Sequence, residues 1–236
     1  MNYILSIIFF LQRKILPGFY VKKGDLVIDI GSGDKPFWRA DVFFDNLSLA
    51  NNQRISHLPT VHDVGLFFDG NVEAMPFKDK AFDFSFCSHL LEHVQNPAAA
   101  LQEIMRISKR GYIEVPSAAI ESLSPFESHL WYIYHVNHRL VFVRKSKLMH
   151  DMQTLQVKTY GYLVKKVKRP FIRLYWNDSI DYNIINDVPT GQAFVPFEKN
   201  GVVGGKNWYL ACIKIFRKIY YKQKSISKSQ LLKDTI

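Results

Sequence analysis

The stretch VIDIGSGDKPFWRADVFFD, residues 27–45, decides the fold of this chain. It begins with a short apolar run bounded by Gly24 and Gly31, a pattern typical of a buried parallel strand. A Gly-x-Gly turn follows, and only about ten residues, Gly31 to Ala40, separate the two apolar runs, close to the minimum for a crossover. No third glycine occurs near Pro36, which argues against a cofactor whose pyrophosphate needs a close helix N-terminus.

Strand and helix patterns alternate after this stretch. Strands are expected at residues 26–30, 41–45, 66–70, 81–88 and 111–117, and a helix at 97–110 that begins at Pro97. This alternation predicts an α/β fold with a parallel sheet and right-handed crossovers. The run NWYLACIKIFRK, residues 207–218, predicts a late strand.

We expect a single domain over residues 1–236. Residues 20–118 would form its core, residues 118–205 an insertion on the substrate side, and residues 219–236 a basic tail. The two cysteines, Cys87 and Cys212, lie far apart without metal-ligand spacing. We therefore expect neither a disulfide framework nor a metal site, and a cytoplasmic location fits.

The net charge of +10 comes entirely from the second half of the chain. Residues 1–120 hold 12 Lys+Arg and 13 Asp+Glu, whereas residues 121–236 hold 19 and 8. A basic surface of this kind attracts an acidic substrate, an anionic membrane or nucleic acid, and the alternative is a solvated, lysine-rich edge.

The first 20 residues are strongly apolar, but the run from Ile4 to Leu11 is much shorter than the roughly 20 residues of a spanning helix. Two interpretations remain. The segment covers one face of the sheet, or it lies in a membrane interface with Arg13 and Lys14 at the headgroups.

Ligands of open α/β sheets bind beyond the carboxyl ends of the strands, so the residues that end each strand are the candidate site. Gly31 and Gly33 allow close approach of the backbone to a ligand. Asp45 can accept hydrogen bonds from both ribose hydroxyls of an adenosine. Asn71 and the Val72 backbone N–H suit an adenine edge, and FDFSFCSHLLEHV, residues 82–94, would face the reacting group.

Together these segments resemble class I S-adenosylmethionine-dependent methyltransferases of the type 11 family, over roughly residues 20–118. The resemblance implies a Rossmann-like fold, with a mostly parallel sheet of roughly seven strands and helices on both faces. Residues 207–218 would then be its antiparallel strand.

The resemblance also implies a role for each of the candidate site residues toward S-adenosylmethionine. Asp29, Gly31 and Gly33 would lie against its methionine part, and Asp45 would hold the ribose. Asn71 and Val72 would frame the adenine, and Ser88 and His89 would line the sulfonium side. The short crossover leaves Asp41 as the alternative for the ribose.

His89 and His93 are the candidate general bases, because histidine titrates near neutrality. The alternative for His93 is a structural hydrogen bond within the LEHV turn. Glu92 could orient a histidine, bind a metal or face solvent, and we favour solvent or a structural role. Glu114 lies within a strand and needs a partner.

The resemblance implies methylation of a small-molecule acceptor, which could be lipid-linked, a sugar or otherwise anionic. The aromatic segment 128–145 could wall the acceptor site or belong to the core. Cys87 lacks the preceding proline of the nucleophile in some cytosine methyltransferases, so we interpret it as a core residue. The Asp/Asn-Pro-Pro-aromatic motif of amino-methylating DNA enzymes is also absent. Nucleic acid is therefore a disfavoured partner. The alternatives are a non-catalytic cofactor-binding or membrane-surface accessory protein, and a nicotinamide-dependent oxidoreductase.

Overall fold

The structure is a computed structural model of the 236-residue chain. It describes residues 15–47, 60–149 and 169–188, with isolated positions at 151, 167, 214, 217, 232, 233, 235 and 236. The predictions for residues 1–14, including contact with a membrane interface, lie outside the described residues, as does most of 207–236.

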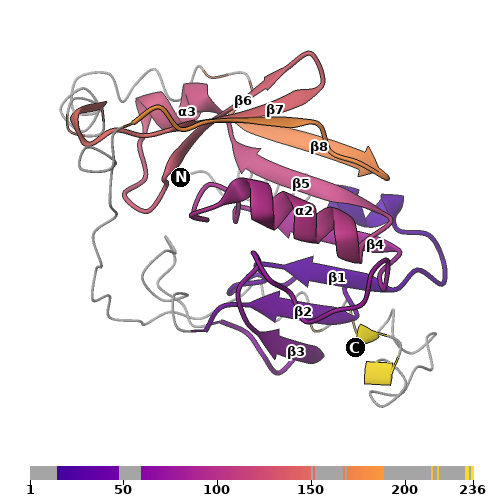
Figure 1. The fold of residues 1–236 in the computed structure, drawn as a ribbon. Coiled ribbons are helices and arrows are strands. Elements are labelled where there is room, and N and C mark those ends of the chain that lie inside the picture. Colours follow the sequence, from indigo (N-terminus) through magenta and orange to yellow (C-terminus); the bar gives the residue numbers. More distant parts are fainter. Residues whose placement is uncertain are drawn as a thin grey trace.

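The centre of the described chain is a six-stranded sheet with the order β3-β2-β1-β4-β5-β8 (Figure 1). Its strands are β1 (Val27–Ile30), β2 (Val42–Asp45), β3 (Leu66–Asp69), β4 (Phe84–Ser88), β5 (Arg110–Pro116) and β8 (Phe171–Asn177). The first five run parallel, and β8 pairs antiparallel with β5. The predicted α/β fold with a mostly parallel sheet is confirmed. Among the described residues this sheet has six strands, where roughly seven were expected.

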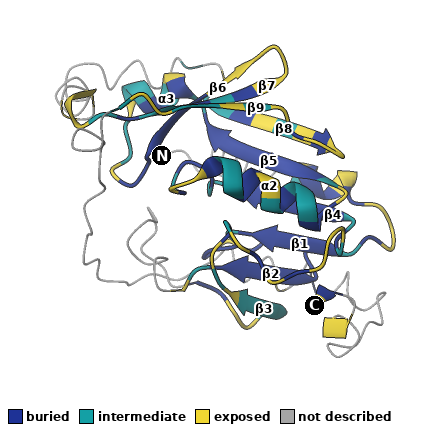
Figure 2. Ribbon diagram, in the orientation of Figure 1, coloured by how far each residue is buried: buried dark blue, intermediate teal, exposed yellow. Residues whose placement is uncertain are grey.

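Both faces of this sheet are covered, which explains why its central strands are almost uniformly apolar. Every residue of β1, β2 and β4 is buried (Figure 2). On one face lies α2 (Pro97–Ile107), whose Leu101, Ile104 and Ile107 join a large apolar cluster with Ile28 and Ile30. On the other face Val27, Phe43, Phe84, Phe86 and Tyr112 pack against Val21 and Phe37.

Helix α2 begins where the sequence predicts. Pro97 occupies the first turn, where its missing N–H costs nothing, and Asn96 Oδ1 accepts a hydrogen bond of 3.1 Å from the backbone N–H of Ala99. The crossover from β1 to β2 has no helix at all, since residues 31–41 form only turns. This short connection brings the carboxyl end of β1 beside that of β2, with Ile30 opposite Phe44.

The insertion folds as a second sheet with the order β6-β7-β9. Its strands are β6 (Trp131–Val136), β7 (Arg139–Arg144) and β9 (Tyr182–Ile185), and it is preceded by α3 (Ala118–Leu123). Trp131 Nε1 donates to the Val94 carbonyl at 2.8 Å, which ties this sheet to the loop after β4. The short η2 (Leu16–Tyr20) precedes the main sheet.

The prediction of a late strand at residues 207–218 is wrong where it can be tested. Lys214 and Arg217, the residues of that run that the structure describes, are helical. The antiparallel position beside β5 is taken instead by β8, which the sequence analysis did not delimit. A short apolar run does not distinguish strand from helix by periodicity alone, and here the edge of the sheet was already filled.

No helix among the described residues is both long enough and apolar enough to cross a membrane.

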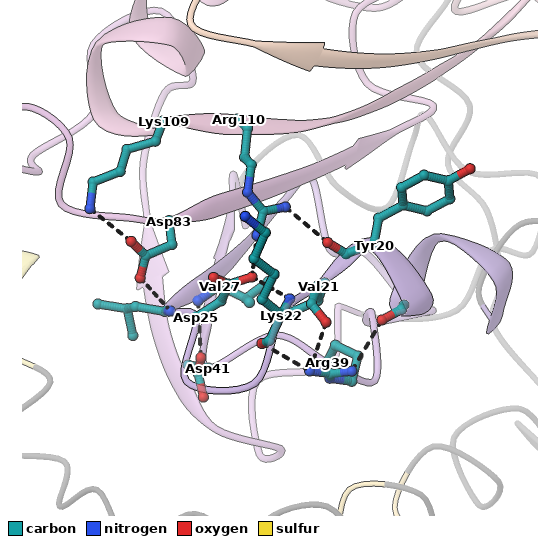
Figure 3. Close-up of polar contacts among 12 residues, drawn as sticks. Tyr20, Val21, Lys22, Asp25, Val27, Arg39, Asp41, Asp83, Lys109 and Arg110 are labelled. Atoms are coloured by element: carbon teal, nitrogen blue, oxygen red, sulfur yellow. Dashed lines mark hydrogen bonds and ion pairs between the residues drawn. The ribbon is translucent and has the colours of Figure 1, made fainter.

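The amino ends of the strands are held by side-chain carboxylates that accept backbone N–H groups (Figure 3). Asp41 Oδ2 accepts from Val27 N at 2.9 Å, and Asp83 Oδ2 accepts from Leu26 N at 2.9 Å. Lys109 Nζ also lies 2.8 Å from Asp83 Oδ1. Asp41 therefore lies at the amino ends of the parallel strands, opposite the candidate site at their carboxyl ends, and it fixes the start of β1.

Replacing Asp41 with alanine should lower the free energy of unfolding by about 1–3 kcal/mol, because the buried Val27 N–H loses its acceptor. Denaturant unfolding followed by circular dichroism measures this. The control is Asp181→Ala, which removes an exposed ion pair with Arg139 and should change stability by less than about 1 kcal/mol. Equal effects of the two substitutions would contradict the structural role of Asp41.

Candidate active site

The glycine turn after β1 is held against the end of β2 by backbone geometry and by one carboxylate. Gly31 and Gly33 have φ values of 74° and 58°, which side chains with a Cβ rarely adopt. Gly31 N donates to the Phe44 carbonyl at 2.8 Å, and Gly33 N donates to Asp45 Oδ2 at 2.7 Å. Asp45 is therefore brought to the turn, as the ribose role requires, although its ligand role stays a prediction.

The other cofactor candidates around this turn support the loops. Asp29 is buried, and its Oδ2 accepts from Phe37 N at 2.6 Å, which draws the crossover back over the sheet. Asn71 Oδ1 accepts from Glu73 N at 3.0 Å, while the Val72 side chain is part of the core. Only the exposed edge of Asn71 and backbone atoms of the Val72 turn are thus free to meet an adenine.

His89 lies between two fully buried carboxylates at the carboxyl end of β4. Its Nε2 is 3.2 Å from Glu114 Oε1 and its Nδ1 is 3.1 Å from Glu92 Oε1. Its backbone has φ 58°, a strained value for histidine, and its N–H donates to the Glu114 carbonyl at 2.8 Å. The side chain remains 24% exposed, so it is fixed and yet open to a substrate.

Glu114 collects donors from three strands and is completely buried. Its Oε2 accepts from Tyr112 at 2.9 Å and from Arg173 Nε on β8 at 2.7 Å, and its Oε1 accepts from Ser88 Oγ at 3.4 Å. Burial and the carboxylate both raise the pKa of Tyr112, which stays a donor. Burial lowers the pKa of Arg173, but Glu114 raises it more, so the net shift is upward.

Glu92 is fully buried, so the interpretation of a solvent-facing side chain is wrong. Burial by itself raises its pKa, but His89, His129 and His93 together lower it to about 2. His93 Nδ1 lies 3.1 Å from the Ser128 carbonyl, and burial lowers the pKa of this histidine to about 4, with a further contribution from His129. The His93 backbone N–H donates to the Leu90 carbonyl at 2.9 Å within the turn, as considered, whereas its side chain contacts the insertion.

The insertion contributes a second buried charge cluster that the sequence analysis missed. His129 Nδ1 is 2.6 Å from Glu121 Oε2, and Lys145 Nζ pairs with Glu121 Oε1. Burial raises the pKa of Glu121, but His129 and Lys145 outweigh it, and the net shift is downward. No sequence pattern links these residues, because they meet only when α3, β6 and β7 pack together.

A cavity of about 720 Å³ opens beside the His89 cluster. It is bordered by the start of α3, by β6 and by the start of β8. Phe171, one of its lining residues, packs edge-on against His89 with ring centroids 5.1 Å apart. The lining includes Arg169 and Arg173, and no aspartate or glutamate among the described residues. Arg173 already pairs with Glu114, so Arg169 is the lining arginine whose charge would attract an anionic ligand.

Comparison with known proteins agrees with this geometry. Residues 38–113 match the model of the type 11 family, described as a methyltransferase domain. An uncharacterized methyltransferase of Mycobacterium leprae is 32% identical over 111 residues, 45% of this chain and 41% of the relative. An uncharacterized protein of Methanocaldococcus jannaschii is 33% identical over 109 residues, 46% of this chain and 47% of the relative. The chain thus spans less than half the length of these relatives.

Similar solved structures include a SAM-dependent methyltransferase from Thermotoga maritima, at 18% identity, 49% of this chain, 59% of that chain and a TM-score of 0.34. A protein from Pyrococcus horikoshii has 18% identity, covering 67% and 82% of the two chains, with a TM-score of 0.40. Scores of this size carry no functional argument. Residues 38–113 are thus similar to a methyltransferase domain, and the mostly parallel six-stranded sheet is the α/β fold that the sequence predicted.

Glu114→Gln should lower the free energy of unfolding by about 1–3 kcal/mol, because an amide cannot accept from all of these donors. The loss is smaller than for a fully buried ion pair, since the Arg173 side chain is 34% exposed and can reach water. Thermal and denaturant unfolding measure it. The matched control is Glu127→Gln at an exposed position, and a loss as large there would contradict the prediction.

Proposed function

We propose that this protein binds S-adenosylmethionine at the carboxyl ends of β1, β2 and β4 and transfers its methyl group to a small-molecule acceptor. The observation that carries the proposal is the contact between Gly33 and Asp45. It brings the glycine turn, which would contact the methionine tail, next to the carboxylate that would hold the ribose. The matched methyltransferase domain covers Asp45 and the β4 site.

The residues suit the cofactor in detail. The glycine turn offers no Cβ to block the methionine part. Asp45 accepts from Gly33 N and from Asn46 N, and a carboxylate oxygen can accept more than one hydrogen bond, so a ribose hydroxyl could share these oxygens. The cofactor, when bound, supplies an electrophilic methyl group on a sulfonium. A pyrophosphate has no comparable site at this turn, because no helix begins between the turn and β2, a stretch that the structure describes in full. This disfavours the nicotinamide alternative.

His89 is the proposed general base, and His93 is the weaker candidate because its Nδ1 is engaged by Ser128. Glu92 and Glu114 flank the His89 ring, and Glu114 orients it through a contact of 3.2 Å. The adjoining cavity, with Arg169, would hold an anionic acceptor, whether a lipid-linked compound, a sugar derivative or another metabolite.

Asp45→Asn should weaken the binding of S-adenosylmethionine and S-adenosylhomocysteine by about 10- to 100-fold, because charge-assisted hydrogen bonds to the ribose are lost. Isothermal titration calorimetry measures both ligands. Asp181→Asn, on the second sheet, is the matched control and should bind normally. If the unmodified, folded protein binds neither ligand, the proposed function is wrong; if Asp41→Asn alone weakens binding, the assignment of the ribose to Asp45 is wrong.

His89→Asn should lower methyl transfer by about 10²–10⁴-fold while leaving cofactor affinity unchanged. Asparagine is chosen because it tolerates the left-handed backbone at this position better than alanine does. The assay offers labelled S-adenosylmethionine to metabolite and lipid extracts and counts the label transferred. Cofactor binding without any transfer by the unmodified protein would instead support the non-catalytic accessory role.

A further inference from the structure

The Glu92 carboxylate is an unexplained group next to the proposed active site. It is 0% exposed, and neither of its oxygens accepts a hydrogen bond from the described residues. His89 Nδ1, at 3.1 Å from Oε1, is within ion-pair distance but without hydrogen-bond geometry. A buried anion with unsatisfied oxygens is costly, and an ion that binds them is one of the few explanations.

Two histidines converge on this carboxylate. Ligand atoms of Glu92, His93 and His129 all lie within 4.8 Å of one another. Metal bonds of about 2.0–2.2 Å to nitrogen and oxygen place neighbouring ligands roughly 3–4 Å apart, so small side-chain rotations would close the site. His129 Nε2 already lies 3.9 Å from Glu92 Oε1.

The surroundings of both histidines fit metal binding. His129 Nδ1 contacts Glu121 Oε2 at 2.6 Å, and His93 Nδ1 contacts the Ser128 carbonyl at 3.1 Å. A carboxylate or carbonyl on one ring nitrogen fixes the tautomer and leaves the lone pair on the other nitrogen, which is the usual arrangement of metal-binding histidines. Glu121 in turn pairs with Lys145, so the carboxylate that orients His129 is itself held in place.

We propose that Glu92, His93 and His129 bind one divalent transition-metal ion. Two imidazoles and one carboxylate suit Zn²⁺, Mn²⁺, Fe²⁺ or Co²⁺, whereas Mg²⁺ and Ca²⁺ prefer oxygen ligands alone. Three protein ligands leave coordination positions for water or for an acceptor oxygen. The binding of an acceptor oxygen rests on the proposed function. The proposal departs from the expectation of no metal site and takes up the metal-binding alternative considered for Glu92.

Direct metal titration tests the proposal without any assay of activity. The full chain, stripped with a chelator, is titrated with Zn²⁺ and with Mg²⁺ by calorimetry in the absence of S-adenosylmethionine. We expect one equivalent of Zn²⁺ with micromolar or tighter affinity, and no comparable binding of Mg²⁺. Co²⁺ should give visible absorption bands that report nitrogen ligation.

Substitutions locate the bound ion. Glu92→Gln and His129→Gln should each weaken Zn²⁺ binding at least 100-fold, and Glu121→Gln, which acts through His129, should weaken it about 10- to 100-fold. His135→Gln and His138→Gln, in the exposed part of the β6–β7 hairpin, are the matched controls and should bind normally. Circular dichroism and S-adenosylmethionine binding show that each variant is folded.

Two results would overturn the proposal. One is the absence of stoichiometric Zn²⁺ binding by the unmodified protein. The other is binding that survives both Glu92→Gln and His129→Gln in folded variants, or that depends equally on the hairpin histidines. Because S-adenosylmethionine binding is measured separately, a failed metal site and a failed methyltransferase function give different results: the first removes only Zn²⁺ binding and the second only cofactor binding.

Discussion

The arrangement of the site depends on one buried carboxylate, that of Glu114. A negative charge with no access to water must be matched by donors, and here the donors come from β4, β5 and β8. Arg173 on β8 therefore joins the antiparallel strand to the parallel sheet electrostatically as well as through the ladder. The same carboxylate fixes one side of the His89 ring. The position of the proposed base is thus coupled to the edge of the sheet.

Carboxylates have different roles at the amino ends and at the carboxyl ends of the parallel strands. At the amino ends, Asp41 and Asp83 accept backbone N–H groups and secure the starts of strands. At the carboxyl ends, Asp45 secures the glycine turn, while Glu92 and Glu114 surround a histidine that stays accessible. Because parallel strands all end at one edge, stabilising groups and reactive groups are separated by the length of the strands.

The second sheet gives the insertion a defined relation to the chemistry. Trp131 anchors it to the loop that follows β4, and this contact brings His129 beside Glu92 and His93. The cavity with Arg169 and Arg173 lies at the junction of the same elements. The aromatic segment is therefore partly core, where Trp131 and Tyr132 are buried, and partly wall, where Tyr134 and His135 line the cavity.

The sequence by itself determined the parallel strands, the start of α2 and the glycine turn, and it named Asp45 for the ribose with Asp41 as the alternative. These features depend on local rules: apolar runs between breakers, a proline in the first turn, and polar residues at strand ends. Only the tertiary structure decided that Asp41 lies at the far edge, that β8 and not residues 207–218 completes the sheet, and that Glu92 is buried among histidines. Those outcomes depend on contacts between residues distant in the chain, and neither periodicity nor composition encodes which distant partner fills an edge or neutralises a buried charge.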